Sequence, residues 1–220
     1  MPRILDTESN PILGTHLRTI RSVHLQKDPH RFREALHEIG RFMAYEIAKG
    51  LCIDMEQVPT PLGTKPEPVL AETPVLVTVL RASLPMWEGM LSVFRDSPTI
   101  FLGAARREGL PKNGRMEIDM GYAALADVEG RTLIYIDPMI ATGSTIEIAH
   151  ADITKKAGCP SRVIVAGAIG YLRSVERLES TIPRCTAIVA SADPELNEKG
   201  YIVPGLGDAG DLAFGPKLTS

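Results

Sequence analysis

The sequence lacks the features of several common protein classes. Its three cysteines, Cys52, Cys159 and Cys185, lie far apart, and neither a CxxC pair nor a Cys/His cluster appears. This spacing indicates neither a disulfide framework nor a zinc site, so we expect reduced thiols in a cytoplasmic protein. A basic excess is also missing: the formal net charge is -3. That balance argues against a protein that coats nucleic acid, but it leaves room for a local basic pocket.

Long apolar runs are absent as well. The longest, "VIVAGAIGYL" from Val163, is far shorter than the roughly 20 residues that a membrane span requires. The first residues also lack the apolar core of a signal peptide, so we expect no membrane partner. With 220 residues, 44% of them hydrophobic and 23% charged, the chain is expected to form one domain over residues 1–220.

Five apolar runs predict buried strands. They are continuous rather than alternating, which is typical of strands covered on both faces. Helix-like segments lie between several of them, and this alternation predicts an α/β fold with a mainly parallel, twisted sheet flanked by helices. The predicted strands are Val75–Leu80, Thr99–Ala104, Thr132–Ile136, Arg162–Ile169 and Thr186–Ser191, and the intervening helices are Leu84–Phe94, Thr145–Ala157 and Ser174–Thr181.

The N-terminal part contains a further helix pattern at residues 29–51. Apolar side chains recur there at three- and four-residue spacing, and Gly50 is a suitable stop. The next segment, "VPTPLGTKPEPVLAETP", is rich in proline. We interpret it as an excursion or a small hairpin rather than as a domain linker.

The stretch "DPMIATGST", Asp137–Thr145, joins a predicted strand to a predicted helix. Gly143 lets the backbone approach a ligand, and successive N–H groups at the start of a helix form an anion site. The alternative is that a serine or threonine here only caps the helix. Asp137 at the carboxyl end of the strand is suited to ribose hydroxyls or a hydrated metal ion. A Walker loop and a GxGxxG fingerprint are both absent.

A second unusual segment is "LNEKGYIVPGLGDAGDLAFG", Leu196–Gly215, with five glycines. A free loop would be an inefficient use of so many glycines. Tight turns that form a wall of backbone donors and acceptors around a planar base would use them better.

Together these segments resemble the uracil phosphoribosyltransferases, which belong to the type I phosphoribosyltransferases. "DPMIATGS" is similar to their binding motif for phosphoribosyl pyrophosphate (PRPP), and "GYIVPGLGDAGD" is similar to their uracil-recognition segment. The resemblance implies that PRPP is bound by Asp137, Pro138, Met139, Ile140, Ala141, Thr142, Gly143, Ser144, Thr145 and Asp208. It also implies that Ile202, Gly207, Asp208 and Ala209 surround uracil.

The resemblance extends over most of the chain and is weakest at residues 54–73. "VTVLRASLPMWEGML" resembles the family's pyrophosphate loop, with Arg81 as the cationic contact. "FLGAARREGL" resembles the strand before a flexible hood, at about residues 106–126, with Arg106 as a second phosphate ligand. The family's first helices correspond to about residues 15–50, and its uracil-recognition segment to about 196–215.

Three positions depart from the family pattern. Ser144 stands where the family usually has the second glycine of Thr-Gly-Gly-Ser, and a Cβ there would restrict the backbone if positive φ were needed. Ser83 replaces the glycine of Leu-Arg-Ala-Gly, where a side chain would either crowd pyrophosphate or donate to it. Ala105 replaces an aromatic residue, next to the added base Arg107. These departures put catalytic efficiency in doubt.

The resemblance implies that uracil and PRPP give uridine monophosphate (UMP) and pyrophosphate in pyrimidine salvage. Mg²⁺ is expected to bind mainly through PRPP and water rather than protein ligands. Asp208, Arg106 and Asp137 are the expected catalytic residues. A homodimer or higher homo-oligomer is expected, with the apolar N-terminal helix as an interface, and GTP is a possible effector. Two alternatives stay open: a diverged regulatory protein that binds nucleotide or RNA with weak catalysis, and transfer to another base such as a purine.

Overall fold

The computed structural model describes residues 2–5, 9–106 and 118–216, with backbone only at 104–106 and 118–122. A seven-stranded sheet forms its centre, in the order β1-β9-β8-β7-β4-β5-β6. Neighbouring strands are parallel except for the β5–β6 pair. The strands are β1 (Arg3–Ile4), β4 (Val75–Leu80), β5 (Thr99–Arg106), β6 (Ile118–Ala124), β7 (Thr132–Ile140), β8 (Arg162–Tyr171) and β9 (Cys185–Asp193).

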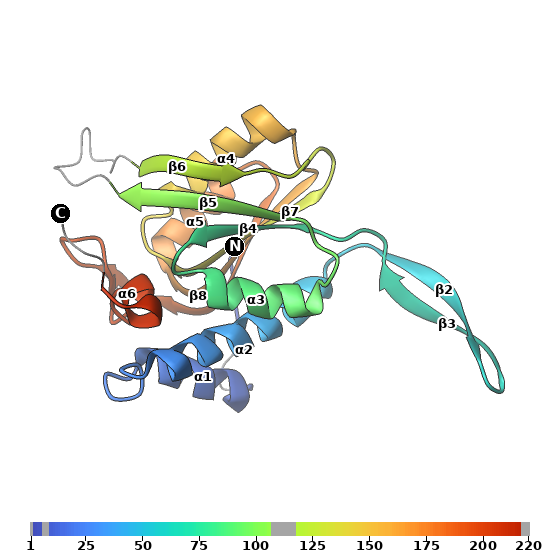
Figure 1. The fold of residues 1–220 in the computed structure, drawn as a ribbon, viewed down its shortest axis with the longest axis horizontal. Coiled ribbons are helices and arrows are strands. Elements are labelled where there is room, and N and C mark those ends of the chain that lie inside the picture. Colours follow the sequence, from blue (N-terminus) through green and yellow to red (C-terminus); the bar gives the residue numbers. More distant parts are fainter. Residues whose placement is uncertain (1, 6–8, 107–117, 217–220) are drawn as a thin grey trace.

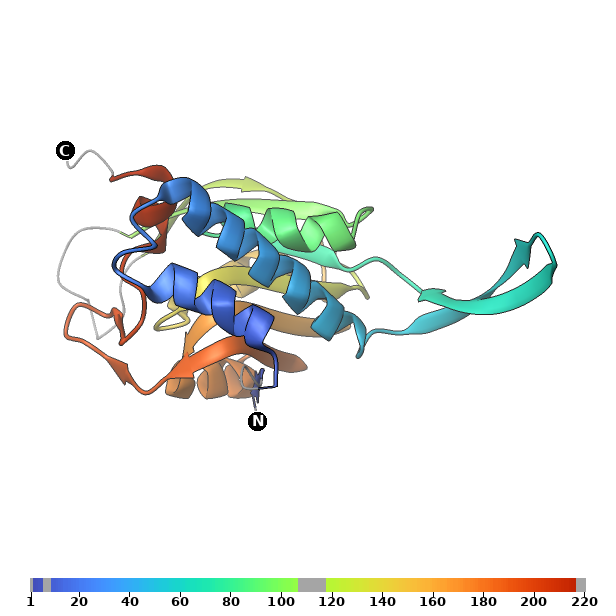
Figure 2. The ribbon, with the colours of Figure 1, turned by 90° about the horizontal axis from the view of Figure 1, so that it is seen from below.

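Helices cover both faces of this sheet (Figure 1). One face packs against α1 (Pro11–Arg21), α2 (Pro29–Ala48) and α3 (Leu84–Val93), as Figure 2 shows from below. The other face packs against α4 (Ser144–Ala157) and α5 (Leu172–Thr181). Alternate strand residues point into two separate cores: Leu76 lies in the α2–α3 cluster, whereas Val75 and Val77 lie in the α4–α5 cluster. Burial on both faces explains why the strands read as continuous apolar runs.

The predicted mainly parallel sheet flanked by helices is confirmed. The five predicted strands are β4, β5, β7, β8 and β9, and the three intervening helices are α3, α4 and α5. Most differences lie at the ends of elements, where local signals are weakest. β7 continues to Ile140, so Asp137 lies inside the strand and not at its end. Helix α4 ends as expected, with Lys155 and Lys156 in its last turn and Gly158 as its C-cap.

Several short elements were not predicted. Helix α1 was not predicted from its own pattern, and neither was the edge strand β6, of which only the backbone is described up to residue 122. Near the C-terminus, β10 (Glu195–Leu196) pairs antiparallel with β11 (Ile202–Val203), and α6 (Ala209–Phe214) follows. Their few residues carry no readable periodicity.

Helices α2 and α3 touch through their backbones. A Cβ atom added at Gly40 would lie 2.1 Å from the carbonyl oxygen of Met86, and one at Gly89 would lie 2.0 Å from that of His37. Real Cβ atoms do not approach so closely, so each helix presents a glycine to the other. This contact fixes α3 on α2, and α3 begins three residues after Arg81.

The proline-rich segment forms a two-stranded hairpin of β2 (Ile53–Thr60) and β3 (Gly63–Leu70). It projects away from the rest of the molecule, at the right of both Figure 1 and Figure 2. Ile53, Met55 and Leu62 are exposed on it. The prediction of a small hairpin is therefore confirmed.

The expected oligomer interface at the N-terminal helix stays a prediction, but the apolar stripe that suggested it is used within the chain. The apolar residues of its predicted stripe are fully or almost fully buried against the sheet and α3. They are Phe32, Leu36, Ile39, Met43 and Ile47. This face of the helix therefore belongs to the core of its own chain. Among the described residues, no helix combines the length and the apolar character needed to traverse a lipid bilayer.

The glycine contact gives a stability prediction. Gly89→Ala should lower the free energy of unfolding by more than about 3 kcal/mol, because the new methyl group meets backbone that has no room to move. Helix propensity alone would favour the same change by about 1 kcal/mol. Gly63→Ala is the control, since an added Cβ there meets nothing within 4 Å. Urea denaturation of both variants is the measurement, and equal stability would contradict the contact.

Candidate functional site

The predicted site residues meet at the carboxyl edge of the sheet. β4 lies between β5 and β7. After β4 the chain forms β5 and β6 on one side of it, and then crosses to form β7 on its other side. The helices that follow β4 and β7 cover opposite faces. Ligands of open α/β sheets bind in a crevice at such a reversal, outside the carboxyl ends of the two strands. The Arg81 loop follows β4 and the Thr142–Thr145 loop follows β7, so both begin at this place.

The loop after β7 has the geometry of an anion site. Gly143 is the N-cap of α4 with φ of 72°, and no side chain caps the helix. The alternative that a serine or threonine serves only as an N-cap is therefore not observed. The hydroxyl of Thr142 accepts instead from the N–H of Ser144, 3.4 Å away. Hydroxyl groups and the positive end of α4 face the same turn.

Ser144 fits this loop without strain. The residue with positive φ is Gly143, and Ser144 begins α4 with an ordinary backbone conformation. The condition under which its Cβ would restrict the backbone is therefore not met. The departure from the second family glycine leaves the shape of the turn intact.

Helix α5 supports the turn from behind. The guanidinium of Arg177 donates to the carbonyl oxygen of Thr142 and lies 3.5 Å from the carboxylate of Glu147. Thr181 also donates to Glu147, at 3.1 Å. Arg177 and Thr181 therefore bind the carboxylate of Glu147 in the first turn of α4, close to the place where an anion would bind. Sequence analysis did not single out Arg177.

Asp137 turns its carboxylate toward its own strand. Oδ1 accepts from the N–H of Met139 at 3.0 Å. Pro138 interrupts the regular pairing with β8, which resumes at Met139 and Ile140. The acid thus stands where the strand bends, three residues before its end.

The far side of α4 is fixed to the same strand. The Tyr135 hydroxyl lies 3.1 Å from Nδ1 of His150. Burial lowers the pKa of His150, so the imidazole is neutral at neutral pH. This contact anchors the helix without adding charge behind the anion site.

Arg81 connects the crevice to the C-terminal segment. Its Nη2 lies 3.2 Å from Oδ1 of Asp211 and 3.4 Å from the carbonyl oxygen of Gly215. Its Nε is buried and has no hydrogen-bond partner among the described residues. A Cβ added at Gly210 would lie 3.9 Å from both Ala82 Cβ and Arg81 Nη2. The loop after β4 and the glycine-rich segment are therefore in contact.

The glycine-rich segment forms tight turns, as predicted. Gly205, Gly207 and Gly215 have φ of 55°, 97° and 82°, which only glycine adopts readily. Asp208 caps α6, because its Oδ1 accepts from the N–H of Asp211 at 3.0 Å. Ile202 and Ala209 are buried, whereas Gly207 and Asp208 are exposed.

An ion pair missed by sequence analysis supports this segment. Arg21 and Asp193 join at 2.7 Å, and both contact Gly205. The available signal was Asp193, an acid two residues after a predicted apolar strand, much as Asp137 follows another. Its partner lies 172 positions away, and no local pattern links the two.

Two predictions fall outside what the structure describes. The backbone of Arg106 ends β5, but its side chain and that of Ala105 are not described. Residues 107–117, the main part of the predicted hood, are not described either. The roles of Arg106 and the hood therefore stay predictions.

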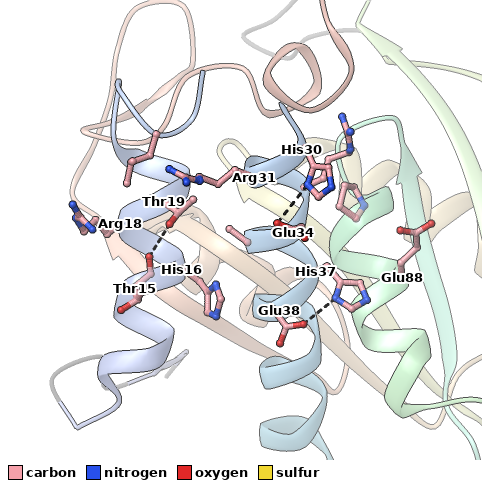
Figure 3. A pocket seen from close by; sticks show the side chains of 14 residues that line it. Thr15, His16, Arg18, Thr19, His30, Arg31, Glu34, His37, Glu38 and Glu88 are labelled. Carbon is pink, nitrogen blue, oxygen red and sulfur yellow. Dashed lines mark hydrogen bonds and ion pairs between the residues drawn. The ribbon is translucent and has the colours of Figure 1, made fainter. Parts of the chain in front are cut away.

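A pocket of about 870 Å³ lies elsewhere, on the outer face of α1, α2 and α3 (Figure 3). His30 and Glu34 are 3.4 Å apart there, and His37 and Glu38 are 3.2 Å apart. None of the predicted site residues lines it. The loops that carry the predicted motifs meet at the carboxyl edge of the sheet instead, so that edge is the better candidate.

Comparison with known proteins agrees with this geometry. The family model described as uracil phosphoribosyltransferase matches residues 7–216. The chain belongs to the uracil phosphoribosyltransferase family. The curated uracil phosphoribosyltransferase of Porphyromonas gingivalis is 38% identical over 94% of this chain and 95% of its own, and that of Pyrococcus furiosus is 40% identical over 88% and 83%. A solved structure of the AQ2163 protein from Aquifex aeolicus has a TM-score of 0.84 and 31% identity, with both chains fully covered.

Ser83, the second departure from the family pattern, points away from the crevice. It is 1% exposed. Its hydroxyl lies 2.8 Å from that of Thr78 and donates to the carbonyl oxygen of Val79. The side chain closes a turn inside the protein, so it neither crowds the site nor offers it a donor.

The position of Ser83 predicts a separation of stability from activity. Ser83→Ala should lower the free energy of unfolding by about 1–3 kcal/mol, because it leaves the Thr78 hydroxyl with one partner fewer. The rate of transfer by the folded enzyme should stay within about twofold, since no substrate contact is lost. Urea denaturation and steady-state kinetics measure the two effects. A large loss of rate at unchanged stability would place the hydroxyl in the site.

Proposed function

We propose that this phosphoribosyltransferase transfers the phosphoribosyl group of PRPP to uracil and releases UMP and pyrophosphate, as in pyrimidine salvage. The observation that carries this proposal is the Arg81–Asp211 contact, 3.2 Å long. It joins the pyrophosphate loop of the family pattern to the base-recognition segment. A phosphate turn, a cation and a base-reading segment at one crevice are the parts that this reaction needs.

The 5′-phosphate of PRPP would bind to Thr142, Gly143, Ser144 and Thr145. Support comes from the positive φ of Gly143 and the uncapped start of α4. The N–H of Ser144 makes only a 3.4 Å contact with the Thr142 hydroxyl, which an anion could replace, and the helix dipole favours negative charge there. Residues 138–141, which lead into the turn, would line the approach.

Asp137 would accept hydrogen bonds from the ribose hydroxyls. Its place beside the phosphate turn supports this role, because a ribose 5-phosphate bound at α4 extends back toward β7. Arg81 and Arg106 would bind the pyrophosphate. For Arg81 the support is its position on the loop after β4, beside β7; for Arg106 it is the family pattern alone.

The donor set fits a magnesium ion held through the substrate. No group of three His, Cys, Asp or Glu side chains that could hold a metal exists in the described part of the chain. Mg²⁺ keeps several waters and often binds by one or two carboxylates plus substrate phosphates. Asp137, beside the phosphate turn, is one carboxylate that could approach such an ion. When bound with PRPP, the ion would neutralise charge on the departing pyrophosphate.

Uracil would lie against Ile202, Gly207, Asp208 and Ala209. Gly207 brings backbone close to the base, and the buried Ile202 and Ala209 hold the segment in place. Alternating backbone donors and acceptors suit the edge of a pyrimidine. Asp208 would orient the base or assist loss of its N1 proton, and its role as the cap of α6 is compatible with either.

Transfer would proceed by displacement at the anomeric carbon through a cation-like transition state. Such a reaction depends on alignment and electrostatics rather than on a covalent nucleophile. The phosphate turn fixes one end of the sugar, and the C-terminal segment fixes the incoming base. Closure of the predicted hood would exclude water.

The regulatory alternative has lost its main motivation. It rested on Ser83 and Ser144, which were expected to disturb the phosphate loops. Ser83 faces the interior, and Ser144 needs no positive φ. Weak catalysis therefore has no support from these two positions.

We also propose a homodimer or higher homo-oligomer. The support is the β2–β3 hairpin, because an isolated two-stranded hairpin with exposed Ile53, Met55 and Leu62 is marginally stable in water. A response to GTP and a cytoplasmic location stay predictions from the family resemblance.

The decisive test is a direct assay with purified protein, Mg²⁺, PRPP and a panel of pyrimidine and purine bases. Uracil alone should yield a nucleoside monophosphate, identified as UMP by mass. No product with uracil would refute the proposal, and RNA binding would then be measured. Product with a purine would point to the other enzyme alternative.

Asp208 can be tested without loss of its capping role. Asp208→Asn should lower turnover at least about tenfold, because the charge near the base is removed. Asparagine caps helices about as well as aspartate, so stability should hold. Asp208→Ala is the comparison and should lose about 1 kcal/mol of stability in addition. Unchanged turnover of Asp208→Asn would remove the carboxylate from the mechanism.

A further inference from the structure

A partly buried ion pair joins the first helix to the last long strand. Arg21 is the final residue of α1, and Asp193 is the final residue of β9. Arg21 Nη1 donates to Asp193 Oδ2 and Nη2 donates to Oδ1, both at 2.7 Å. Nη2 also donates to Ser191 Oγ at 3.0 Å. The side chain of Asp193 is only 6% exposed, so this two-point contact is shielded from water and salt.

Both backbone groups of Gly205 bind to this ion pair. Its N–H donates to Asp193 Oδ2 at 2.8 Å, and its carbonyl oxygen accepts from Arg21 Nη1 at 3.0 Å. Gly205 has φ of 55°, and a Cβ there would lie 2.1 Å from the carbonyl oxygen of Ile202. The ion pair therefore holds the turn between Ile202 and Gly207, two residues of the uracil segment.

The N-terminal helices attach to this segment at two further points. With its side-chain nitrogen facing the carbonyl groups, Gln26 donates to Leu206 at 3.1 Å and to Ile20 at 2.8 Å. Arg33 of α2 donates to the carbonyl oxygen of Ala213 at 2.6 Å. Beside the burial of its own apolar side chains, the glycine-rich segment thus has polar contacts with α1, α2, β9 and the connection between the two helices.

We propose that Arg21 and Asp193 are positioning residues that set the affinity for the base. They act through Gly205 and do not touch substrate. Their loss displaces the backbone at residues 202–207 that reads uracil, whereas the phosphate turn after β7 keeps its own support from Arg177 of α5. The inference rests on the proposed function and adds residues outside the motifs that suggested it.

A positioning role and a merely structural role differ in kinetics. If the ion pair only stabilised the fold, the folded fraction of a variant would bind both substrates as before. If it positions the segment, the KM for uracil rises while the KM for PRPP holds. The split between the two KM values therefore separates the explanations.

The test compares Arg21→Lys and Asp193→Asn with the wild-type chain. Lysine keeps the charge but cannot form the two-point contact. Each variant should raise the KM for uracil by roughly tenfold or more and leave the KM for PRPP within about twofold. Arg3→Gln is the matched control, because the Arg3–Glu46 pair also joins a strand to an N-terminal helix but lies away from the segment; its KM values should not change.

A second readout does not depend on activity. Hydrogen exchange followed by peptide mass spectrometry should speed up across residues 202–207 in Arg21→Lys. The Gly205 carbonyl oxygen then loses its guanidinium donor, and Asp193, the acceptor of the Gly205 amide, is no longer held by the two-point contact. If Arg21→Lys fails to fold, Gln26→Leu replaces it, since this change removes only the Gln26 hydrogen bonds to the segment. It should raise the KM for uracil and speed up exchange at residues 202–207, each by a smaller amount. If the wild-type protein is inactive toward uracil, the proposed function is refuted, but the hydrogen-exchange measurement still tests whether the ion pair holds residues 202–207. Unchanged exchange at residues 202–207, or equal rises in both KM values, would overturn this inference.

Discussion

The backbone contact between α2 and α3 is the constraint on which the site depends. Gly40 and Gly89 let the two helices approach until carbonyl oxygens occupy the space of absent side chains. Helix α3 cannot shift along α2 without a clash, so its first turn has one place on the sheet. The loop that precedes this turn carries Arg81. The close packing of Gly40 and Gly89 thus helps to determine where Arg81 lies.

Helix α2 also affects the opposite wall of the crevice. Its Arg33 holds the end of α6, with the guanidinium 6.0 Å from the centre of the Phe214 ring. Apolar burial, worth about 25 cal/mol per Å², fixes the layers. It also anchors the glycine-rich segment, whose Ile202, Leu206, Ala209 and Ala213 lie in the core. Hydrogen bonds to the Arg21–Asp193 pair then set the backbone between these anchors.

Most of the sheet and the conformation of the turn at Gly143 could be predicted from the sequence, because both depend on local patterns. Two-sided burial makes β4, β7 and β8 readable as apolar runs, and Gly143 between a strand and a helix signals its own conformation. The remainder depends on distant partners. Edge strand β6 and the short α6 lack a periodic apolar face, and Arg21 meets Asp193 only after the chain has folded. The ends of elements were missed for a related reason. The predicted strand stopped at Ile136, where the apolar run meets Asp137, yet pairing with β8 continues to Ile140.

The two serine departures show why a family pattern needs geometry beside it. A glycine in a motif is required only where φ is positive or where another atom fills the place of Cβ. In the phosphate turn that position is Gly143, with φ of 72°, and the next residue is already helical. In the loop after β4 the Cβ of Ser83 points to the interior, where its hydroxyl binds Thr78 and Val79. Both serines therefore replace glycines whose conformational freedom this chain does not use, and neither changes the backbone of the loop in which it stands.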